Sequence, residues 1–489
     1  MKPIKLDDFY KHTYLSALTY APSGKRAAYI VKTGDPKENK YNSDIYMYDK
    51  GAHTRMTTEG DVKFFAFIDE RTIIFAATRG KLMEESEKKG NIFTAFFRLD
   101  ILSKKASKLF TLPIQASDIR PIGKDQYLLQ AEIDLSCPDF YLLDQKEQKK
   151  VVDRNNAEKD YEVLEESPFW YNGRGFISGK RGALFLYNAK KERLTRINSP
   201  EIDVSGYTYD NEYVYYFGED RKPEMKDRHG VYSYSLTNGT KEQVLNDRFC
   251  VYSIHSLGDK LILIGTDQKR YGGSENPYFY LIDKKTGNTK VLNPADESMG
   301  HGVLTDVTLG ATRSTKVDGD YLYFAATDRY ATHLKRIDLD GDIETVVKRE
   351  GALIDFDVMK GNIMAIGMYD MKLPEIYENK KDDLVCISNY NDAILDGKYV
   401  AEPQYLSVQS EGFDIDGWVL LPIDYDPNKT YPAILDIHGG PKCAYGPVYF
   451  HEMQAWASAG YFVFFCNPTG SDGRGNAFAD IRLKWGGPD

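Results

Sequence analysis

The sequence is short of several features that would place it in a special class. Only 5 of its 489 residues are cysteines, and they are scattered, odd in number and without a CxxC pair. This pattern argues against a disulfide framework or a cysteine-based metal site, and favours reduced core thiols in a cytoplasmic protein. Lys and Arg total 63 against 73 Asp and Glu, a net charge of -10 with no basic block. Such a chain is a poor candidate for binding nucleic acid.

Long hydrophobic runs are also lacking. The segment Met1–Pro22 has no apolar centre of a secretory signal, because Asp7, Asp8, Lys11 and His12 interrupt it. The longest apolar stretches have the length of a strand and fall far short of the ~20 residues that a membrane helix needs. We therefore expect a protein without a membrane segment.

Ligands for a metal ion are not grouped in the sequence. The histidines outside the last ninety residues have no partner at ligand spacing. Asp338–Asp342 begins like a calcium loop, but Ile343 stands where an EF-hand loop needs glycine, so a hairpin turn is the better interpretation. Asn238-Gly239-Thr240 is interpreted as a turn in the same way. We expect neither a metal nor another cofactor.

From about residue 20 to residue 391 the sequence contains a repeated β pattern. Aromatic and β-branched residues alternate over short runs that mostly end in Asp or Asn, and successive ends lie 44 to 55 residues apart. A period near 48 suits four short strands with their turns, which is the size of one propeller blade. No long amphipathic helix is expected here. The ends are Asp49, Asp100, Asp144, Asn188, Ser235, Asp283 and Asp338.

These seven ends predict a seven-bladed β-propeller over residues 1–395. Glu375-Ile376-Tyr377 is a candidate for an eighth blade. The run ending at Asp144 has polar neighbours and could belong to an insertion. The polar run Lys81–Gly90 is interpreted as a surface excursion. A blade cannot bury both faces of its own sheet, so packing against neighbouring blades has to do so.

After about residue 396 the period changes. Tyr405–Gln409 and Asp414–Pro422 predict two strands, and Tyr431–Ile437 predicts a buried strand. Val448–Ala459 has helical spacing of its apolar residues, and Tyr461–Cys466 is a second buried run. A further helix is expected over Ala477–Trp485. This alternation is typical of a parallel α/β sheet, and residues 396–489 are therefore interpreted as the N-terminal part of an α/β-hydrolase domain.

Three motifs in this part resemble the prolyl oligopeptidase family of serine peptidases, and most closely its acylaminoacyl-peptidase-like branch. They are His438-Gly439-Gly440-Pro441 after a strand, the glycine-rich run Asn467–Gly475, and Trp485-Gly486-Gly487. The family joins a propeller to a C-terminal hydrolase domain, so the resemblance covers the whole chain in architecture. The sequence departs from the family at Thr469 and Arg474, where Arg and Tyr are common.

The resemblance implies roles for residues in these loops. Acyl transfer needs N–H donors that face a developing oxyanion, and the N–H of Gly440 would be one of them. His438, Gly439 and Pro441 would support that loop. The residues that would shape the floor near the nucleophile are Asn467, Pro468, Gly470, Ser471 and Gly473. For this second loop, a plain strand-to-helix connection is an equally good interpretation.

The sequence contains no G-x-S-x-G motif. In this fold the nucleophile follows the next strand, and the acid and the histidine come later. We therefore expect the catalytic Ser, Asp and His beyond Asp489, in roughly 170 further residues by the resemblance, as missing sequence or on a second polypeptide. Without them, the strand Ala433–Ile437 would leave an apolar sheet edge open.

The leading hypothesis is a peptidase that cleaves short or N-acylated peptides, with the propeller restricting access. A homo-oligomer is left open. The acidic cluster with which the dipeptidyl-peptidase branch holds a free amine is not found; Tyr213–Asp220 is the nearest run. Two alternatives remain: a non-catalytic propeller scaffold with a degenerate hydrolase remnant, and an esterase on the same scaffold, which uses the same acyl chemistry.

Overall fold

The computed structural model describes residues 1–380, 383–410 and 412–482. Its contacts divide the chain into two compact units. Unit 1 contains residues 1–55, 268–281 and 290–489, and unit 2 contains residues 56–267 and 282–289. Among the described residues, no helix is both long and apolar enough to cross a membrane.

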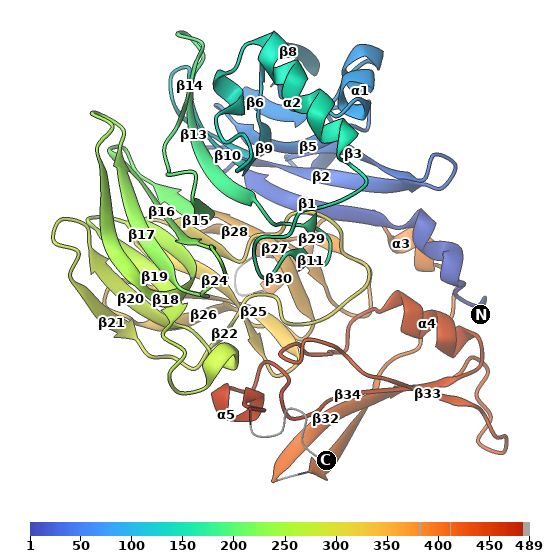
Figure 1. Cartoon of the computed structure of the whole chain (residues 1–489). Coiled ribbons are helices and arrows are strands. Elements are labelled where there is room, and N and C mark those ends of the chain that lie inside the picture. Colours follow the sequence, from blue (N-terminus) through green and yellow to red (C-terminus); the bar gives the residue numbers. More distant parts are fainter. Residues whose placement is uncertain (381–382, 411, 483–489) are drawn as a thin grey trace. The chain divides into compact units, whose positions relative to one another are not determined.

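Most of both units consists of four-stranded antiparallel meanders (Figure 1). In unit 1 the first meander contains β1 (Thr13–Tyr20), β2 (Arg26–Asp35), β3 (Lys40–Asp49) and β4 (Ala52–Arg55). Another contains β27 (Ala352–Met359), β28 (Asn362–Met368), β29 (Glu375–Lys380) and β30 (Asp383–Cys386). A third sheet of unit 1 contains β22 (Ser298–Met299), β23 (Thr315–Asp318), β24 (Tyr321–Asp328), β25 (Ala331–Ile337) and β26 (Ile343–Val347).

Unit 2 repeats the same arrangement. One sheet contains β5 (Val62–Phe67), β6 (Thr72–Ala77), β7 (Thr94–Asp100) and β8 (Lys105–Leu112). The next contains β9 (Gln115–Gly123), β10 (Gln126–Asp134), β13 (Lys180–Asn188) and β14 (Arg193–Arg196). Then follow β15 (Ile202–Tyr209), β16 (Tyr213–Asp220), β17 (His229–Ser235), β18 (Lys241–Leu257) and β19 (Lys260–Thr266). The chain passes between the units within β20 (Tyr278–Asp283) and β21 (Thr289–Asn293).

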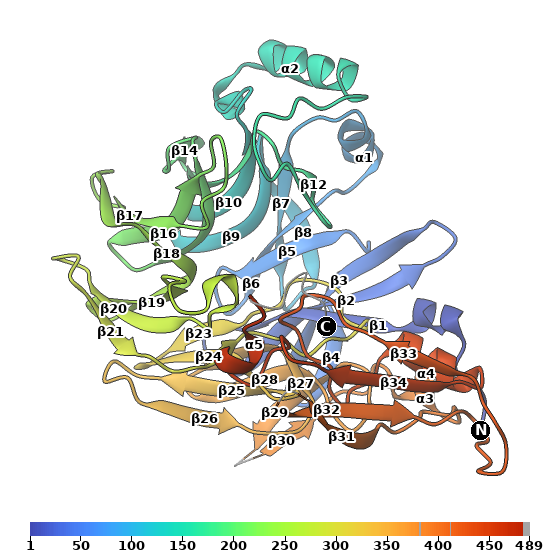
Figure 2. The ribbon, with the colours of Figure 1, turned by 60° about the horizontal axis from the view of Figure 1, so that its bottom comes forward.

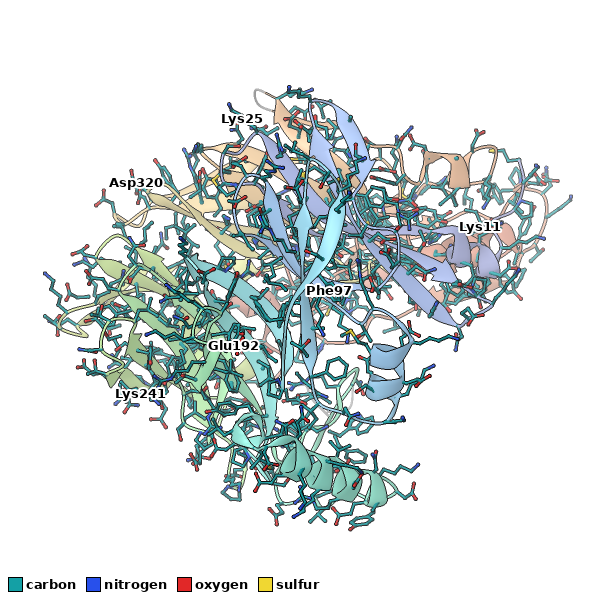
Figure 3. All side chains as sticks on the ribbon, turned by 90° about the horizontal axis from the view of Figure 1, so that it is seen from above. Lys11, Lys25, Phe97, Glu192, Lys241 and Asp320 are labelled. Atoms are coloured by element: carbon teal, nitrogen blue, oxygen red, sulfur yellow. The ribbon has the colours of Figure 1, made fainter. Side chains whose placement is uncertain are left out.

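Apolar side chains at alternate positions of the strands form the core of these sheets. Phe97 on β7, labelled in Figure 3, is buried and stacks on Phe75 of β6 with ring centroids 5.6 Å apart. The Arg79 guanidinium lies over both rings, 4.7 Å from the centroid of Phe75 and 5.2 Å from that of Phe97. Such a cation–π pair lets a charged side chain close the end of an apolar sheet.

The repeated Asp or Asn of the sequence marks the third strand of a meander. The side-chain oxygen of Asp100 accepts the N–H of Ser103 at 2.8 Å, and that of Asn188 accepts the N–H of Lys191 at 2.9 Å. Asp338, directly after β25, accepts the N–H of Gly341 at 2.9 Å in the predicted turn. The carboxylate or amide caps the turn that leads into the fourth strand, which explains the period. Glu375–Tyr377 also lies on a third strand, β29.

One predicted strand is wrong. The run ending at Asp144 forms a 3-10 helix, η2 (Phe140–Leu142), followed by helix α2 (Gln145–Ala157). Asp144 still acts as a cap, but it accepts the N–H of Glu147 at 2.9 Å and opens a helix through a capping box. Helix α2 is mostly polar, with Val152 as its buried residue, so it has no apolar stripe that the sequence could have shown. The other insertion is the exposed α1 (Lys81–Lys88).

Further short elements complete the two units. They are η1 (Leu6–Lys11), β11 (Trp170–Tyr171), β12 (Gly175–Phe176), η3 (Gly272–Ser274) and α3 (Asp392–Leu395). All five cysteines are free and partly exposed, so they are less buried than the predicted core thiols.

The last sheet of unit 1 has the strand order β31-β32-β34-β33. Figure 2 shows its strands side by side: β31 (Gln404–Ser410), β32 (Phe413–Leu420), β33 (Ala433–Asp436) and β34 (Phe462–Asn467). β33 and β34 are parallel, whereas β32 and β34 are antiparallel. Helix α4 (His451–Ser458) connects β33 to β34, and α5 (Asn476–Ala479) follows the glycine-rich loop. The helix predicted over Ala477–Trp485 is shorter than expected, because α5 ends at Ala479 and Asp480 is extended; Trp485–Gly487 lie outside the described residues.

The strand predicted as buried at Tyr431–Ile437 is half exposed. Leu435 and Ile437 are 62% and 74% exposed. The reason is that β33 pairs only with β34 among the described strands and so lies at an edge of the sheet. An open apolar edge was expected for this strand.

The N-terminal residues bond to residues 397–399 and to helix α4. Lys2 forms a parallel bridge with Lys398, with Lys2 N–H to Gly397 O at 2.9 Å and Tyr399 N–H to Lys2 O at 2.8 Å. The N–H of Ile4 donates to Ser458 Oγ on α4 at 3.0 Å. Lys2 and Ile4 are therefore held by residues 397–399 and by Ser458, far from them in the sequence.

A buried carboxylate joins β1 to β27 and gives a testable pH dependence. Asp355 is fully buried, and it accepts the N–H groups of Leu18 at 2.9 Å and Arg313 at 2.8 Å. Burial raises the pKa of Asp355 to about 6. The folded state therefore binds this proton more tightly than the unfolded state, and the free energy of unfolding falls as pH rises from about 4 to about 6.

We expect the variant Asp355→Asn to lack this dependence. Relative to wild type, its unfolding free energy should improve by up to about 3 kcal/mol between about pH 4 and about pH 7, from a shift of about two units at 1.36 kcal/mol each. Urea unfolding of both proteins across this range measures the difference. An offset that does not change with pH would contradict the prediction.

Candidate active site

Two loops meet at one edge of the last sheet. Because β33 and β34 are parallel, their carboxyl ends lie on the same side. His438–Pro441 follows β33, and Asn467–Gly475 follows β34. Ligands of α/β sheets bind in the crevice outside the carboxyl ends of the strands. The structure therefore brings together the two loops that the sequence singled out.

Gly440 has a backbone that only glycine adopts without strain. Its φ is +127°, and a Cβ atom would lie 2.9 Å from Cys443 Sγ and 3.0 Å from Lys442 N. Gly439 differs, because a Cβ there would meet no atom within 4 Å. Among the described residues, no acceptor takes the N–H of Gly440 in a hydrogen bond. An exposed glycine N–H of this kind is available to a ligand oxygen.

His438 lies between the two loops. Its Nδ1 is 2.9 Å from Gly439 O, and its Nε2 is 3.0 Å from Ser471 Oγ. Ser471 is only 1% exposed, so this hydroxyl is not open to a substrate. The ring of His438 also makes an edge contact with Tyr445, with centroids 5.1 Å apart. These contacts suit a residue that positions the loops rather than a general base.

Further hydrogen bonds fix one loop to the other. The Asn467 side chain accepts the N–H of Tyr445 at 2.7 Å and donates to its carbonyl at 2.9 Å. The N–H of Asp472 donates to Cys443 O at 2.9 Å. Burial and the neighbouring Asp472 raise the pKa of the Cys443 thiol. The Asn467 amide and one backbone hydrogen bond thus connect the two loops, which restricts movement of the Gly440 turn.

The glycine-rich loop has positive φ at Gly470 and Gly473. Pro468 accepts the N–H of Ser471 at 3.1 Å, and the Gly470 N–H donates to Phe478 O at 2.8 Å. Gly473 has φ +82°, and its carbonyl accepts the N–H of Arg329 at 2.6 Å. A Cβ on Gly473 would lie 2.3 Å from Arg329 O, so this close backbone approach requires glycine.

Sequence reasoning missed the polar residues that surround these loops. Arg329 and Arg474 both face the buried carboxylate of Asp416, and Arg329 Nη2 forms an ion pair with it. Arg474 therefore has a structural partner at the position where the family commonly has Tyr. The turn of residues 274–276 also lies against the Gly440 loop, through Lys442. No spacing pattern links such distant segments, so only the fold places them here.

Comparison with known proteins finds similar peptidases. The family model described as "Prolyl oligopeptidase family" matches residues 447–489. The chain is similar to the uncharacterized peptidase YuxL of Bacillus subtilis (strain 168), with 25% identity over 100% of this chain and 74% of that protein. It is also 29% identical to dipeptidyl-peptidase 5 of Trichophyton schoenleinii, over 35% of this chain and 25% of that protein.

Solved structures share the fold. A structure of acylaminoacyl peptidase in complex with Z-Gly-Gly-Phe-chloromethyl ketone matches with a TM-score of 0.76 and 20% identity, over 98% of this chain and 68% of that one. The β-propeller domain of the Trilobed protease from Pyrococcus furiosus matches with a TM-score of 0.53 and 15% identity, over 79% of this chain and 99% of that one. The predicted fold class, a β-propeller with a hydrolase part, is confirmed, whereas the number of blades stays a prediction. Residues 447–489 therefore match the prolyl oligopeptidase family of serine peptidases, and the chain as a whole shares the fold of a solved acylaminoacyl peptidase.

Proposed function

We propose that this chain supplies the oxyanion-binding side of a serine peptidase that hydrolyses short or N-acylated peptides through an acyl-enzyme. The observation that carries the proposal is the exposed N–H of Gly440, which has no acceptor among the described residues, at the carboxyl end of β33. When a serine oxygen attacks the substrate carbonyl, negative charge develops on the carbonyl oxygen. A fixed N–H donor at that point stabilises the transition state more than the substrate.

The proposed mechanism also needs a nucleophile, a base and a second oxyanion donor. The nucleophilic Ser, the Asp and the His would lie beyond Asp489, and the N–H after the nucleophile would be the second oxyanion donor. Residues 396–489 would form the first part of the catalytic domain, and residues 1–395 the propeller that restricts access to short peptides. The protein would act in the cytoplasm, on its own or as a homo-oligomer. It would need neither a metal nor another cofactor.

The test of this proposal is intact mass spectrometry of the native protein before and after a fluorophosphonate probe. We expect a mass increase of one probe, on a longer chain or on a companion fragment, since the probe reports an activated serine. A single unlabelled species with only these 489 residues would refute the peptidase proposal. It would support a propeller scaffold with a hydrolase remnant.

The choice of substrate distinguishes acyl-peptide hydrolysis from a second candidate activity, that of a dipeptidyl peptidase. The likeness to dipeptidyl-peptidase 5 favours cleavage after a free N-terminal dipeptide. We expect faster turnover of N-acetyl-alanyl p-nitroanilide than of an unblocked dipeptidyl p-nitroanilide. The opposite order would transfer the proposal to dipeptidyl peptidase activity. Hydrolysis of p-nitrophenyl esters alone, with neither anilide cleaved, would indicate an esterase.

A further inference from the structure

Lys442 directly follows the Gly439–Pro441 turn, and its side chain reaches a distant segment. Its Nζ donates to the carbonyl of Ser274 at 2.8 Å and to Asn276 Oδ1 at 2.5 Å. Both acceptors belong to the turn around η3, far from Lys442 in the sequence. The ammonium therefore connects the candidate oxyanion loop to a separate part of unit 1.

The acceptor side of this contact is rigid. Asn276 is fully buried; its N–H donates to Asn476 Oδ1 at 2.6 Å, and its Nδ2 donates to Asp296 Oδ1 at 2.7 Å. Asp296 in turn accepts the N–H of Asn476 at 2.9 Å. Asn476 opens α5 at the end of the glycine-rich loop. Lys442 thus joins the Gly440 turn to a network that also fixes the second loop.

The charge of Lys442 suits this position. Burial lowers the pKa of its ammonium, while the carboxylates of Asp472, Asp296 and Glu275 act in the opposite direction. A charged donor makes shorter and stronger hydrogen bonds than a neutral one. An apolar side chain of the same length would leave the carbonyl of Ser274 and the amide oxygen of Asn276 without this donor.

We infer that Lys442 is a positioning residue, which holds the Gly439–Pro441 turn in the shape that directs the Gly440 N–H toward the substrate oxygen. This inference rests on the proposed function, because the direction of that N–H matters only if an oxyanion forms there. Lys442 itself touches no reacting atom. Its effect passes through Pro441, over two peptide bonds, to Gly440, and a displacement of about 1 Å at a reacting centre costs about 100-fold in rate.

The test compares Lys442→Met, Lys442→Arg and the control Lys429→Met in the full-length protein. Lys429 is an exposed lysine of the same sheet region, with 69% of its side chain accessible. We expect Lys442→Met to lower kcat for an N-acyl peptide anilide by about 10-fold to 100-fold with little change in KM, since the lost interaction acts in the transition state. Lys442→Arg should recover part of kcat, because it keeps a cation and its donors. Lys429→Met should behave as wild type.

A second readout does not depend on activity. Hydrogen exchange followed by mass spectrometry should show faster exchange of the amides at 439–446 in Lys442→Met, with peptides of unit 2 unchanged. Unchanged exchange in that segment together with wild-type kcat would overturn the inference. So would a rise in KM alone, which would indicate a substrate contact. Faster exchange in a protein that cleaves no substrate would support the tether and refute the proposed function instead.

Discussion

Replacing Gly440 by alanine should lower kcat by about 100-fold to 1,000-fold, the loss seen when one oxyanion donor is removed. The added Cβ would lie 2.9 Å from Cys443 Sγ and 3.0 Å from the backbone nitrogen of Lys442, at a φ of +127° that L side chains rarely adopt. The peptide must rotate to relieve these contacts, and the N–H rotates with it. Kinetics with an N-acyl peptide anilide, together with thermal unfolding, separate this effect from misfolding.

Gly439→Ala is the matched comparison for this variant. Its Cβ would meet no atom within 4 Å, so the turn can keep its shape. We expect a much smaller loss of kcat than for Gly440→Ala, and similar unfolding temperatures for the two variants if strain at position 440 is absorbed locally. Wild-type kcat in Gly440→Ala would remove this glycine from the proposed mechanism.

Breaking the ion pair between Glu166 and Arg181 should cost about 3–5 kcal/mol of unfolding free energy in unit 2, the range for a buried pair that loses one partner. Both side chains are inaccessible, with Arg181 Nη2 2.5 Å from Glu166 Oε1 and Nη1 3.0 Å from Oε2. Burial opposes ionisation of Glu166, but the bonds from Arg181 and from the Gly179 N–H outweigh it, so the pKa of Glu166 lies below its usual value. The variant Glu166→Leu leaves the guanidinium buried without its counter-charge.

Urea unfolding of three variants tests this prediction. Glu166→Leu should show the full loss, whereas Glu166→Leu with Arg181→Met should recover much of it, because no charge is then buried. Asp153→Asn breaks the exposed pair with Lys149, where side-chain exposures are 73% and 61%, and should change stability by less than about 1 kcal/mol. If Glu166→Leu changes stability no more than Asp153→Asn, the pair does not hold the segment before β11.

Much of the sheet architecture could be predicted, because one chemical feature repeats. An alternating apolar run that ends in Asp or Asn marks a third strand, since that side chain caps the next turn. The same feature misled the prediction at Asp144, where the following residues are good helix formers and the cap opens α2 instead. A local rule identifies the cap, and the residues after it decide which element the cap begins.

The candidate site was predictable only where its parts are local. The turn at Gly440 and the loop at Gly473 have glycines that the sequence displays. The residues that hold these two loops in place show no recognisable pattern in the sequence. Asn276 and Arg329 lie more than one hundred residues before the loops they fix, and ordinary polar residues at such distances carry no pattern. Only the fold brings their side chains to the site.

The pairing of Lys2 with the segment around Lys398 has a consequence for synthesis on the ribosome. At a rate of about 5–20 residues per second, the N-terminal segment emerges roughly 20 to 80 seconds before Gly397 and Tyr399 are made. During that interval the backbone groups of Lys2 and the N–H of Ile4 lack the partners that they have in the folded protein. Unit 1 can therefore complete its folding only after the ribosome has passed α4.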